Sequence, residues 1–291
     1  MAPALLRWGA PALFVLLWST GFIGAKLGLP DAGPLIFLAV RFLFAAVLLA
    51  MIALLTGAPW PRRPAAIAHY AVAGLLVHGV YLSGVFTGIA LGVAAGVVAL
   101  IVGLQPLLVA GVAGFVLGER VTARQWLGLV LGFGGVVLVL ERQLEHGAGE
   151  LAGVFAGLVA LVAITAGTLY QKRWCGGMDL RTGSVVQYGA AAILVGAAAL
   201  AVGDTAIDWT PTFVFALLWL VVILSLGAIS LFYALIRRGA ATAVSSLLFL
   251  VPPTTALLAW PLFGETLAPL ALGGMALSGL GVALVTWPRK S

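Results

Sequence analysis

Ten apolar segments follow one another along this chain, and only short polar stretches separate them. An α-helix needs about 20 apolar residues to cross the hydrocarbon core of a bilayer. Gly, Pro and charged residues interrupt the chain at nearly that spacing. We predict membrane-spanning helices at residues 10–28, 34–56, 65–88, 92–117, 125–140, 151–171, 181–202, 212–235, 241–263 and 269–287. The prediction is an all-α integral membrane protein, and ten spans leave no room for a soluble domain.

The composition excludes a soluble globular protein. Hydrophobic residues make up 63% of the chain and charged residues only 8%, whereas soluble domains carry about 25% charged residues. So few charges cannot cover a surface that faces water, so lipid must be the main solvent. In a soluble protein the net charge of +6 would suggest a nucleic-acid partner. Here we expect none, because the charge is better explained by membrane orientation.

The loop charges predict that orientation. If the N-terminus is cytoplasmic, twelve of the 15 Lys and Arg residues fall in inside segments and only Arg142 falls outside. The other two, Lys26 and Arg41, lie at or within spans. Cytoplasmic loops of membrane proteins collect Lys and Arg. The bias therefore predicts that both termini are inside, and it supports the count of ten spans.

The chain also contains an internal repeat. When the sequence is shifted by 146 residues, residues 94–139 align without gaps on 240–285 with 15 identities in 46 positions. The same shift places Lys172 on Lys26. We therefore predict two five-span repeats, residues 1–145 and 146–291. Five is an odd number, so the second repeat enters the membrane from the opposite side. This inverted-topology 5+5 arrangement recurs in secondary transporters that work by alternating access.

Four stretches carry a resemblance to a known family: WSTGFIGAKLG in the first span, FLAVRFLFAAVLL in the second, and LGERVTARQWLG and FGETLAPLALGG after the fourth and ninth. Together they resemble the EamA-type ten-span branch of the drug/metabolite transporter superfamily. The resemblance implies a 5+5 inverted fold that exports metabolites, often amino acids, from a bacterial cytoplasm across the inner membrane. Within this branch, the first span and the aromatic residues look most like the aromatic amino-acid exporters.

Few ionisable residues lie deep in the predicted spans, and such residues mark functional sites by default. Arg41 lies in the second span and His78 in the third, but no Asp or Glu lies deep in any span. Exchange of protons for cationic drugs relies on an embedded carboxylate. We therefore disfavour a permanently cationic drug and expect a neutral, zwitterionic or anionic metabolite, carried by facilitated efflux. Proton-coupled efflux is the alternative, with His78 as the deep group that titrates near neutral pH.

His78 and Tyr81 share a helical face with Val85, and we predict that they contact the substrate. Arg41 either binds a substrate carboxylate or has a structural role. Trp18 and Phe22 lie at i and i+4 in the first span and are candidates to line the cavity. The substrate-binding candidates are His78, Tyr81, Trp18, Phe22, Arg41, Gln105 and Tyr233.

Prolines within two spans predict hinges, because proline removes a helix hydrogen bond. Static kinks are the alternative. The corresponding Gly-Glu pairs of the two repeats are predicted to be structural. The hinge and structural candidates are Pro106, Pro252, Pro253, Gly118, Glu119, Gly264 and Glu265.

Other functions have weaker support. A carrier of phosphorylated or nucleotide-linked sugars should bury several basic residues, and a lipid-modifying enzyme should cluster His, Asp or Glu at one interface. A membrane scaffold without transport activity is the third alternative. We find no metal or nucleotide signature, so we expect a transporter without cofactors and not an enzyme. Glycine-rich spans five and ten are expected to pack together in a monomer, or to form the face of a homodimer.

Overall fold

The computed structural model describes residues 2–93, 95–139, 151–263 and 269–287. Those residues form helices and loops, with one isolated antiparallel β-bridge between Ala32 and Ile207. The helices of the first half are α1 (Ala2–Gly28), α2 (Pro34–Leu55), α3 (Pro64–Gly74), η1 (Leu75–Val80), α4 (Tyr81–Ala90), α5 (Ala95–Val102), α6 (Gln105–Leu117) and α7 (Ala123–Val139). Those of the second half are α9 (Leu151–Trp174), α10 (Leu180–Val202), α11 (Pro211–Trp219), η2 (Leu220–Ala228), α12 (Ile229–Arg238), α13 (Ala241–Ser246), η3 (Leu247–Leu250), α14 (Val251–Phe263) and α15 (Pro269–Thr286).

The helices match the predicted spans closely. Nine stretches among the described residues are long and apolar enough to cross a membrane, and each overlaps one prediction. The remaining predicted span corresponds to α7, a shorter apolar helix over Ala123–Leu138. Hydropathy alone could predict these spans. An apolar segment in lipid has no water to bond its backbone, so it forms a helix that satisfies its own hydrogen bonds.

Four spans are less regular than predicted. The span at 92–117 is two helices, α5 and α6, separated by a turn at residues 103–104. Pro106 is therefore not in mid-helix but in the first turn of α6, where its missing N–H costs nothing. Pro252 and Pro253 likewise lie in the first turn of α14, after the short 3₁₀ segment η3. Spans three and eight contain the π-helical segments η1 and η2.

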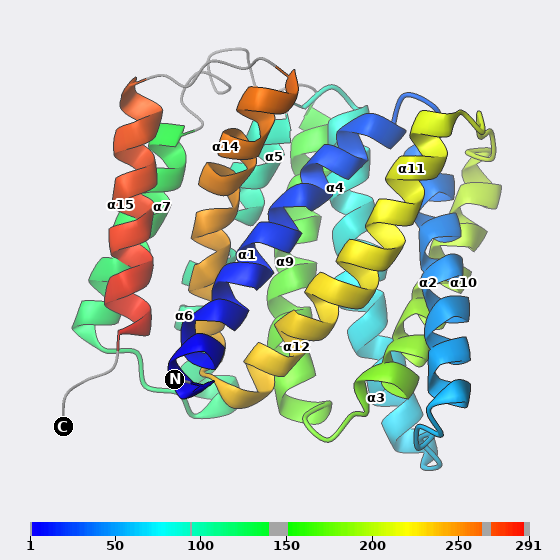
Figure 1. Cartoon of the computed structure of the whole chain (residues 1–291), viewed down its shortest axis with the longest axis horizontal. Coiled ribbons are helices and arrows are strands. Elements are labelled where there is room, and N and C mark those ends of the chain that lie inside the picture. Colours follow the sequence, from blue (N-terminus) through cyan, green and yellow to red (C-terminus); the bar gives the residue numbers. More distant parts are fainter. Residues whose placement is uncertain (1, 94, 140–150, 264–268, 288–291) are drawn as a thin grey trace.

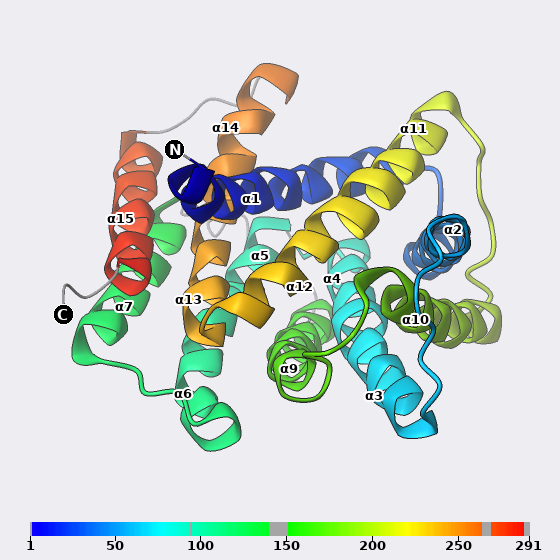
Figure 2. The ribbon, with the colours of Figure 1, turned by 60° about the horizontal axis from the view of Figure 1, so that its bottom comes forward.

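The arrangement of the helices is visible in Figures 1 and 2. The pair α7–α15 forms one edge of the bundle and the pair α2–α10 forms the other, while α1 and the α11–η2–α12 span cross the middle. Helices α1 and α9 run in opposite directions, and the start of α1 lies at the same end of the bundle as the end of α15. We call this the terminal end; it is at the bottom of Figure 1.

Glycines let α7 and α15 approach until their backbones touch. A Cβ atom added at Gly128 would lie 2.6 Å from the Gly281 carbonyl oxygen, and one at Gly135 would lie 2.5 Å from the Gly274 carbonyl oxygen. The Ser278 hydroxyl donates to the Gly132 carbonyl at 3.3 Å. The predicted pairing of spans five and ten is thus present within one chain, through the small residues that favour such contacts in lipid.

Helices α2 and α10 are joined at both ends. At the terminal end, Thr182 donates its hydroxyl hydrogen to the Pro59 carbonyl at 2.7 Å, and Arg181 donates to the Thr56 hydroxyl at 2.8 Å. At the other end, the Asp204 carboxylate accepts the Leu35 backbone N–H at 2.8 Å. Asp204 therefore provides the α2 N-terminus with an acceptor that its N-cap residue, a glycine, cannot supply.

We expect Asp204→Ala to lower the free energy of unfolding by about 1 kcal/mol, because it leaves an N–H at the start of α2 without an acceptor. Thermal unfolding of the purified protein in detergent measures the effect. The matched control is Asp208→Ala in the same loop, since no side-chain hydrogen bond of Asp208 occurs among the described residues. Equal melting temperatures of the two variants would contradict the capping role.

Candidate substrate site at the centre of the bundle

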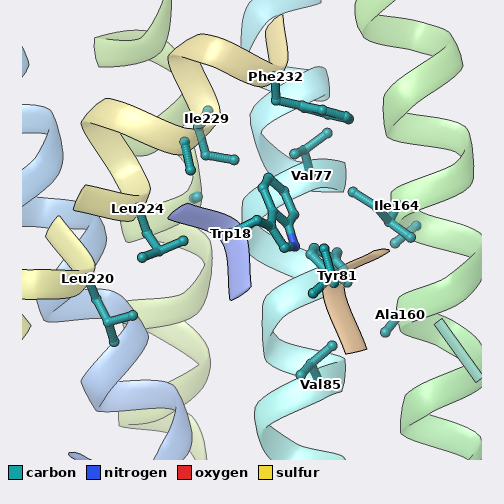
Figure 3. Close-up of a cluster of buried hydrophobic side chains, with 14 of the residues drawn as sticks. Trp18, Val77, Tyr81, Val85, Ala160, Ile164, Leu220, Leu224, Ile229 and Phe232 are labelled. Atoms are coloured by element: carbon teal, nitrogen blue, oxygen red, sulfur yellow. The ribbon is translucent and has the colours of Figure 1, made fainter. Parts of the chain in front are cut away.

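Aromatic and aliphatic side chains from α1, η1, α4, α9 and α12 meet at the centre of the bundle (Figure 3). The Trp18 ring centroid lies 5.4 Å from that of Phe232. Tyr81 lies with Val77 and Val85 on the side of its span that faces Trp18. Trp18 is only 8% exposed and Tyr81 only 5%, so neither residue is an interfacial anchor. Phe22, one turn beyond Trp18, is half-buried and packs against the same core.

His78 lies in the π-helical segment η1 and is fully buried. Its Nε2 atom is 3.2 Å from the Tyr233 hydroxyl, and its ring stacks on Tyr188 with centroids 4.2 Å apart. The Gln187 side chain is a further polar group against this imidazole. The structure therefore brings together two predicted site residues, His78 and Tyr233.

Arg41 is buried near His78, with 5% of its surface exposed. Its Nε donates to the Ser225 hydroxyl at 3.2 Å, and the Tyr188 hydroxyl donates to the Ser225 carbonyl at 3.0 Å. Ser225 belongs to η2, so the guanidinium joins α2 to the eighth span. This contact favours the structural role for Arg41 over direct binding of a substrate carboxylate.

Gln105, the first residue of α6, forms a second buried polar group. Its Nε2 donates to the Thr168 hydroxyl at 3.2 Å and to the Ser245 hydroxyl at 3.3 Å. We call these three residues, from α6, α9 and α13, the amide–hydroxyl cluster. All three side chains are fully buried.

Glu119 forms a charged cluster at the terminal end. It follows Gly118, whose φ of +69° ends α6 in the left-handed conformation that glycine adopts most easily. The carboxylate accepts the Ala241 N–H at 2.8 Å and lies 2.9 Å from the Lys172 ammonium. Burial raises the pKa of Glu119, but the hydrogen bonds from Ala241 and Lys172 outweigh this effect and hold the pKa below its usual value. Gly264 and Glu265, the corresponding pair, lie outside the described residues.

Sequence reasoning missed Tyr188, Ser225 and Thr168. Tyr188 is the residue that the shift of 146 places on Phe42, and the two rings lie 5.9 Å apart. The internal repeat could therefore have predicted Tyr188 as a site residue, as the position that corresponds to Phe42. Nothing in the local sequence distinguishes Ser225 or Thr168 from other small polar residues in spans.

Two other features do not contribute to this site. An outward-facing groove of about 360 Å³ between η1 and α9 is lined only by apolar side chains, including Leu76, Phe155 and Val162. That lining fits lipid acyl chains rather than a polar solute. In the described part of the chain, no three His, Cys, Asp or Glu residues are grouped so that they could hold a metal ion.

Comparison with known proteins decides the family. The sequence profile of the EamA-like transporter family matches residues 9–141 and again residues 151–287. The chain belongs to the EamA-like transporter family. It is a multi-pass membrane protein, and the family consists of transporters.

Several curated proteins resemble this EamA-like transporter over nearly its whole length. An uncharacterised transporter of Bacillus subtilis, YvbV, is 27% identical over 96% of this chain and 91% of its own length. The uncharacterised inner membrane transporter YedA of Escherichia coli K12 is 26% identical over 96% of this chain and 90% of its own. A probable amino-acid metabolite efflux pump of Salmonella typhimurium is 26% identical over 93% of this chain and 91% of its own.

A crystal structure with 20% sequence identity superposes with a TM-score of 0.81 and covers 95% of both chains. At this identity the likeness shows that the EamA-like transporter shares a fold with that protein.

Proposed function

We propose that this chain exports amino acids, aromatic ones among them, or similar small metabolites across a bacterial inner membrane by facilitated alternating access. The observation that supports this best is the chemistry of the buried centre. His78, Tyr81, Tyr233 and Trp18 offer stacking surfaces and hydrogen bonds, while no Asp or Glu is buried among the described residues. Such a site suits a solute without net charge. The name of the Salmonella relative, a probable amino-acid metabolite efflux pump, agrees with this substrate class.

The buried charges do not favour a phosphorylated or nucleotide-linked sugar. Such an anion needs several cations facing one site, and Arg41 is the only Lys or Arg that is buried within the described ranges. Its contact with Ser225 already occupies part of the guanidinium.

The alternating-access part of the proposal rests on an inverted repeat of residues 1–145 and 146–291. The contacts between helices are consistent with it. Helix α2 corresponds to α10 in the repeat and α7 corresponds to α15, and the members of each pair pack against each other. The Ser278–Gly132 hydrogen bond and the Phe42–Tyr188 ring contact each join residues 146 positions apart. Such contacts lie near a pseudo-two-fold axis. Two similar halves can form two related states, one open to each side.

We assign the terminal end to the closed side of the pathway in this state. Val109 and Ala113 of α6 pack against Leu169 of α9 and Ala241 of α13. Below them, Glu119 bridges to Lys172 and to the start of α13. A solute can pass this end only if α6 separates from α9 and α13, which breaks both layers. The loops at this end carry most of the basic residues, so we assign it to the cytoplasm with both termini.

The function is tested by efflux from proteoliposomes loaded with a panel of amino acids, with and without a pH gradient. We expect aromatic amino acids to leave faster than from protein-free vesicles, and at rates that the gradient does not change. If no amino acid moves, the proposed substrate class is wrong. If efflux requires the gradient, the facilitated mechanism is wrong and proton coupling replaces it.

The Glu119 cluster predicts a pH-dependent stability. The folded-state pKa of Glu119 is lowered, so its stabilising effect is present above the unfolded-state value and is lost as the pH falls through the folded-state value. We expect Glu119→Gln to lower the melting temperature at pH 7, and the difference from the native protein to shrink as the pH falls below the ordinary value of 4.5.

Thermal unfolding in detergent between pH 7 and pH 3.5 measures this difference. Other carboxylates, including Asp179, titrate in both proteins and cancel in the comparison. A difference that stays constant over this range would mean that the ionised carboxylate of Glu119 does not support the closed end.

A further inference from the structure

The amide–hydroxyl cluster of Gln105, Thr168 and Ser245 is incomplete as a hydrogen-bonding group. The Gln105 Nε2 atom has two acceptors, but its Oε1 atom is buried with no partner among the described residues. Exchanging the amide nitrogen and oxygen does not help, because the other end of the amide is then unpartnered. A buried amide group that lacks a partner is destabilising, so the cluster has a free position in either orientation.

The two hydroxyl groups also have unused hydrogens. Each accepts a hydrogen bond from Gln105 Nε2, and neither donates one within the described part of the chain. Thr165, one turn earlier in α9, is different: its hydroxyl donates to the Leu161 carbonyl at 2.7 Å. The cluster thus presents one amide acceptor and two hydroxyl donors, all uncharged, in the buried interior.

The position of the cluster connects it to the aromatic centre. Thr168 lies one helical turn beyond Ile164, and Ile164 belongs to the same central cluster as Trp18 and Tyr81 (Figure 3). Gln105 begins α6 after the break from α5, and Ser245 lies just before the change from α13 to η3. Interrupted helices of this kind form substrate sites near the midplane of transporters.

We propose that the amide–hydroxyl cluster binds the zwitterionic backbone of an amino acid, while the aromatic centre one turn away holds its side chain. The inference rests on the proposed function. The ammonium group donates to Gln105 Oε1, and the carboxylate accepts from the hydroxyls of Thr168 and Ser245. A simple amine would leave the two donors unused, and a simple carboxylate would leave the amide oxygen unused. The cluster therefore selects molecules that carry both groups close together.

The test is equilibrium binding of three probes to the purified full-length chain by titration calorimetry. L-phenylalanine carries both groups, phenethylamine lacks the carboxylate, and 3-phenylpropionate lacks the ammonium. We expect the native protein to bind phenylalanine about tenfold or more tightly than either analogue, since each lost group removes a charge-assisted hydrogen bond. Equal affinities for phenylalanine and phenethylamine would overturn the inference.

Variants assign each group of the probe to its partner. Thr168→Val should lower the affinity for phenylalanine toward that for phenethylamine without reaching it, because the Ser245 hydroxyl still donates to the carboxylate. Gln105→Met should bring the affinity for phenylalanine down to that for 3-phenylpropionate. Gln105→Glu should instead strengthen phenethylamine binding, because a carboxylate then meets the amine. Thr165→Val is the matched control on α9, since its hydroxyl is already bonded within its own helix. Ser245→Ala tests the second hydroxyl if Thr168→Val does not fold.

The outcomes separate this inference from the proposed function. If the native protein exports phenylalanine but Thr168→Val and Gln105→Met bind all three probes as the native protein does, the inference is wrong and the function stands. If the native protein neither binds nor exports any amino acid, both are wrong.

Discussion

The variant Gly281→Leu is expected not to accumulate as folded protein. A Cβ atom at Gly281 would lie 2.4 Å from the Gly132 backbone nitrogen and 2.5 Å from the Gly128 carbonyl oxygen. Both obstacles are backbone atoms of α7, so no side-chain rotation relieves them. Gly281→Ala should lower the free energy of unfolding by about 1–3 kcal/mol through overpacking. Leucine must push the two helices apart, which removes the close contact that holds α7 to α15 in lipid.

Size-exclusion chromatography and thermal unfolding in detergent measure the effect. The matched controls are Gly273→Ala and Gly279→Ala in the same helix, where an added Cβ meets no atom within 4 Å. Alanine has the higher helix propensity by about 1 kcal/mol, so these controls should melt at the native temperature or slightly above it. A native-like Gly281→Leu protein would show that the two helices need not touch.

The second large effect is expected at His78. His78→Ala removes the hydrogen bond to Tyr233 and the stacking on Tyr188, and it leaves a cavity in the aromatic centre. We expect the initial rate of amino-acid efflux from proteoliposomes to fall about tenfold or more. Tyr233→Phe keeps the ring and loses only the hydroxyl, so its efflux should fall less.

His69 supplies a matched control for this variant. It also pairs with a tyrosine, through Nδ1 and the Tyr170 hydroxyl at 2.6 Å, and stacks near Trp174. This pair joins α3 to α9, and His69 itself is not one of the buried residues of the aromatic centre. His69→Ala should therefore keep a native rate. Equal losses in the two variants would indicate a general effect on packing, and an unchanged rate in His78→Ala would remove His78 from the substrate site.

The spans could be predicted from the sequence because hydropathy responds directly to the solvent. Lipid requires apolar segments of a certain length, and the chain supplies them between short polar loops. The breaks within spans could not be predicted in the same way. The turn at residues 103–104 and the π-helical segments η1 and η2 change which residues hydrogen bond without changing hydropathy. Pro106 marked the correct place, but as the start of a helix rather than a bend within one.

The candidate site was partly predictable for a similar reason. His78 and Arg41 stood out because ionisable groups in lipid need partners. Their partners, Tyr188, Tyr233 and Ser225, come from other spans, and only Tyr233 was among the predicted residues. The face that a helix turns toward its neighbours is set by packing. In lipid this face has no strong hydrophobic signature, because the lipid-facing side is equally apolar.

The contact between Arg41 and Ser225 also affects how the chain is made. The two residues are 184 positions apart, and a ribosome adds about 5–20 residues per second. The second span therefore exists for about 10 to 40 s before the segment that carries Ser225 has been synthesised. During that time the Arg41 guanidinium must be solvated by water, by lipid head groups or by polar groups of the insertion machinery. Completion of the native contact thus has to wait until the eighth span has entered the bilayer.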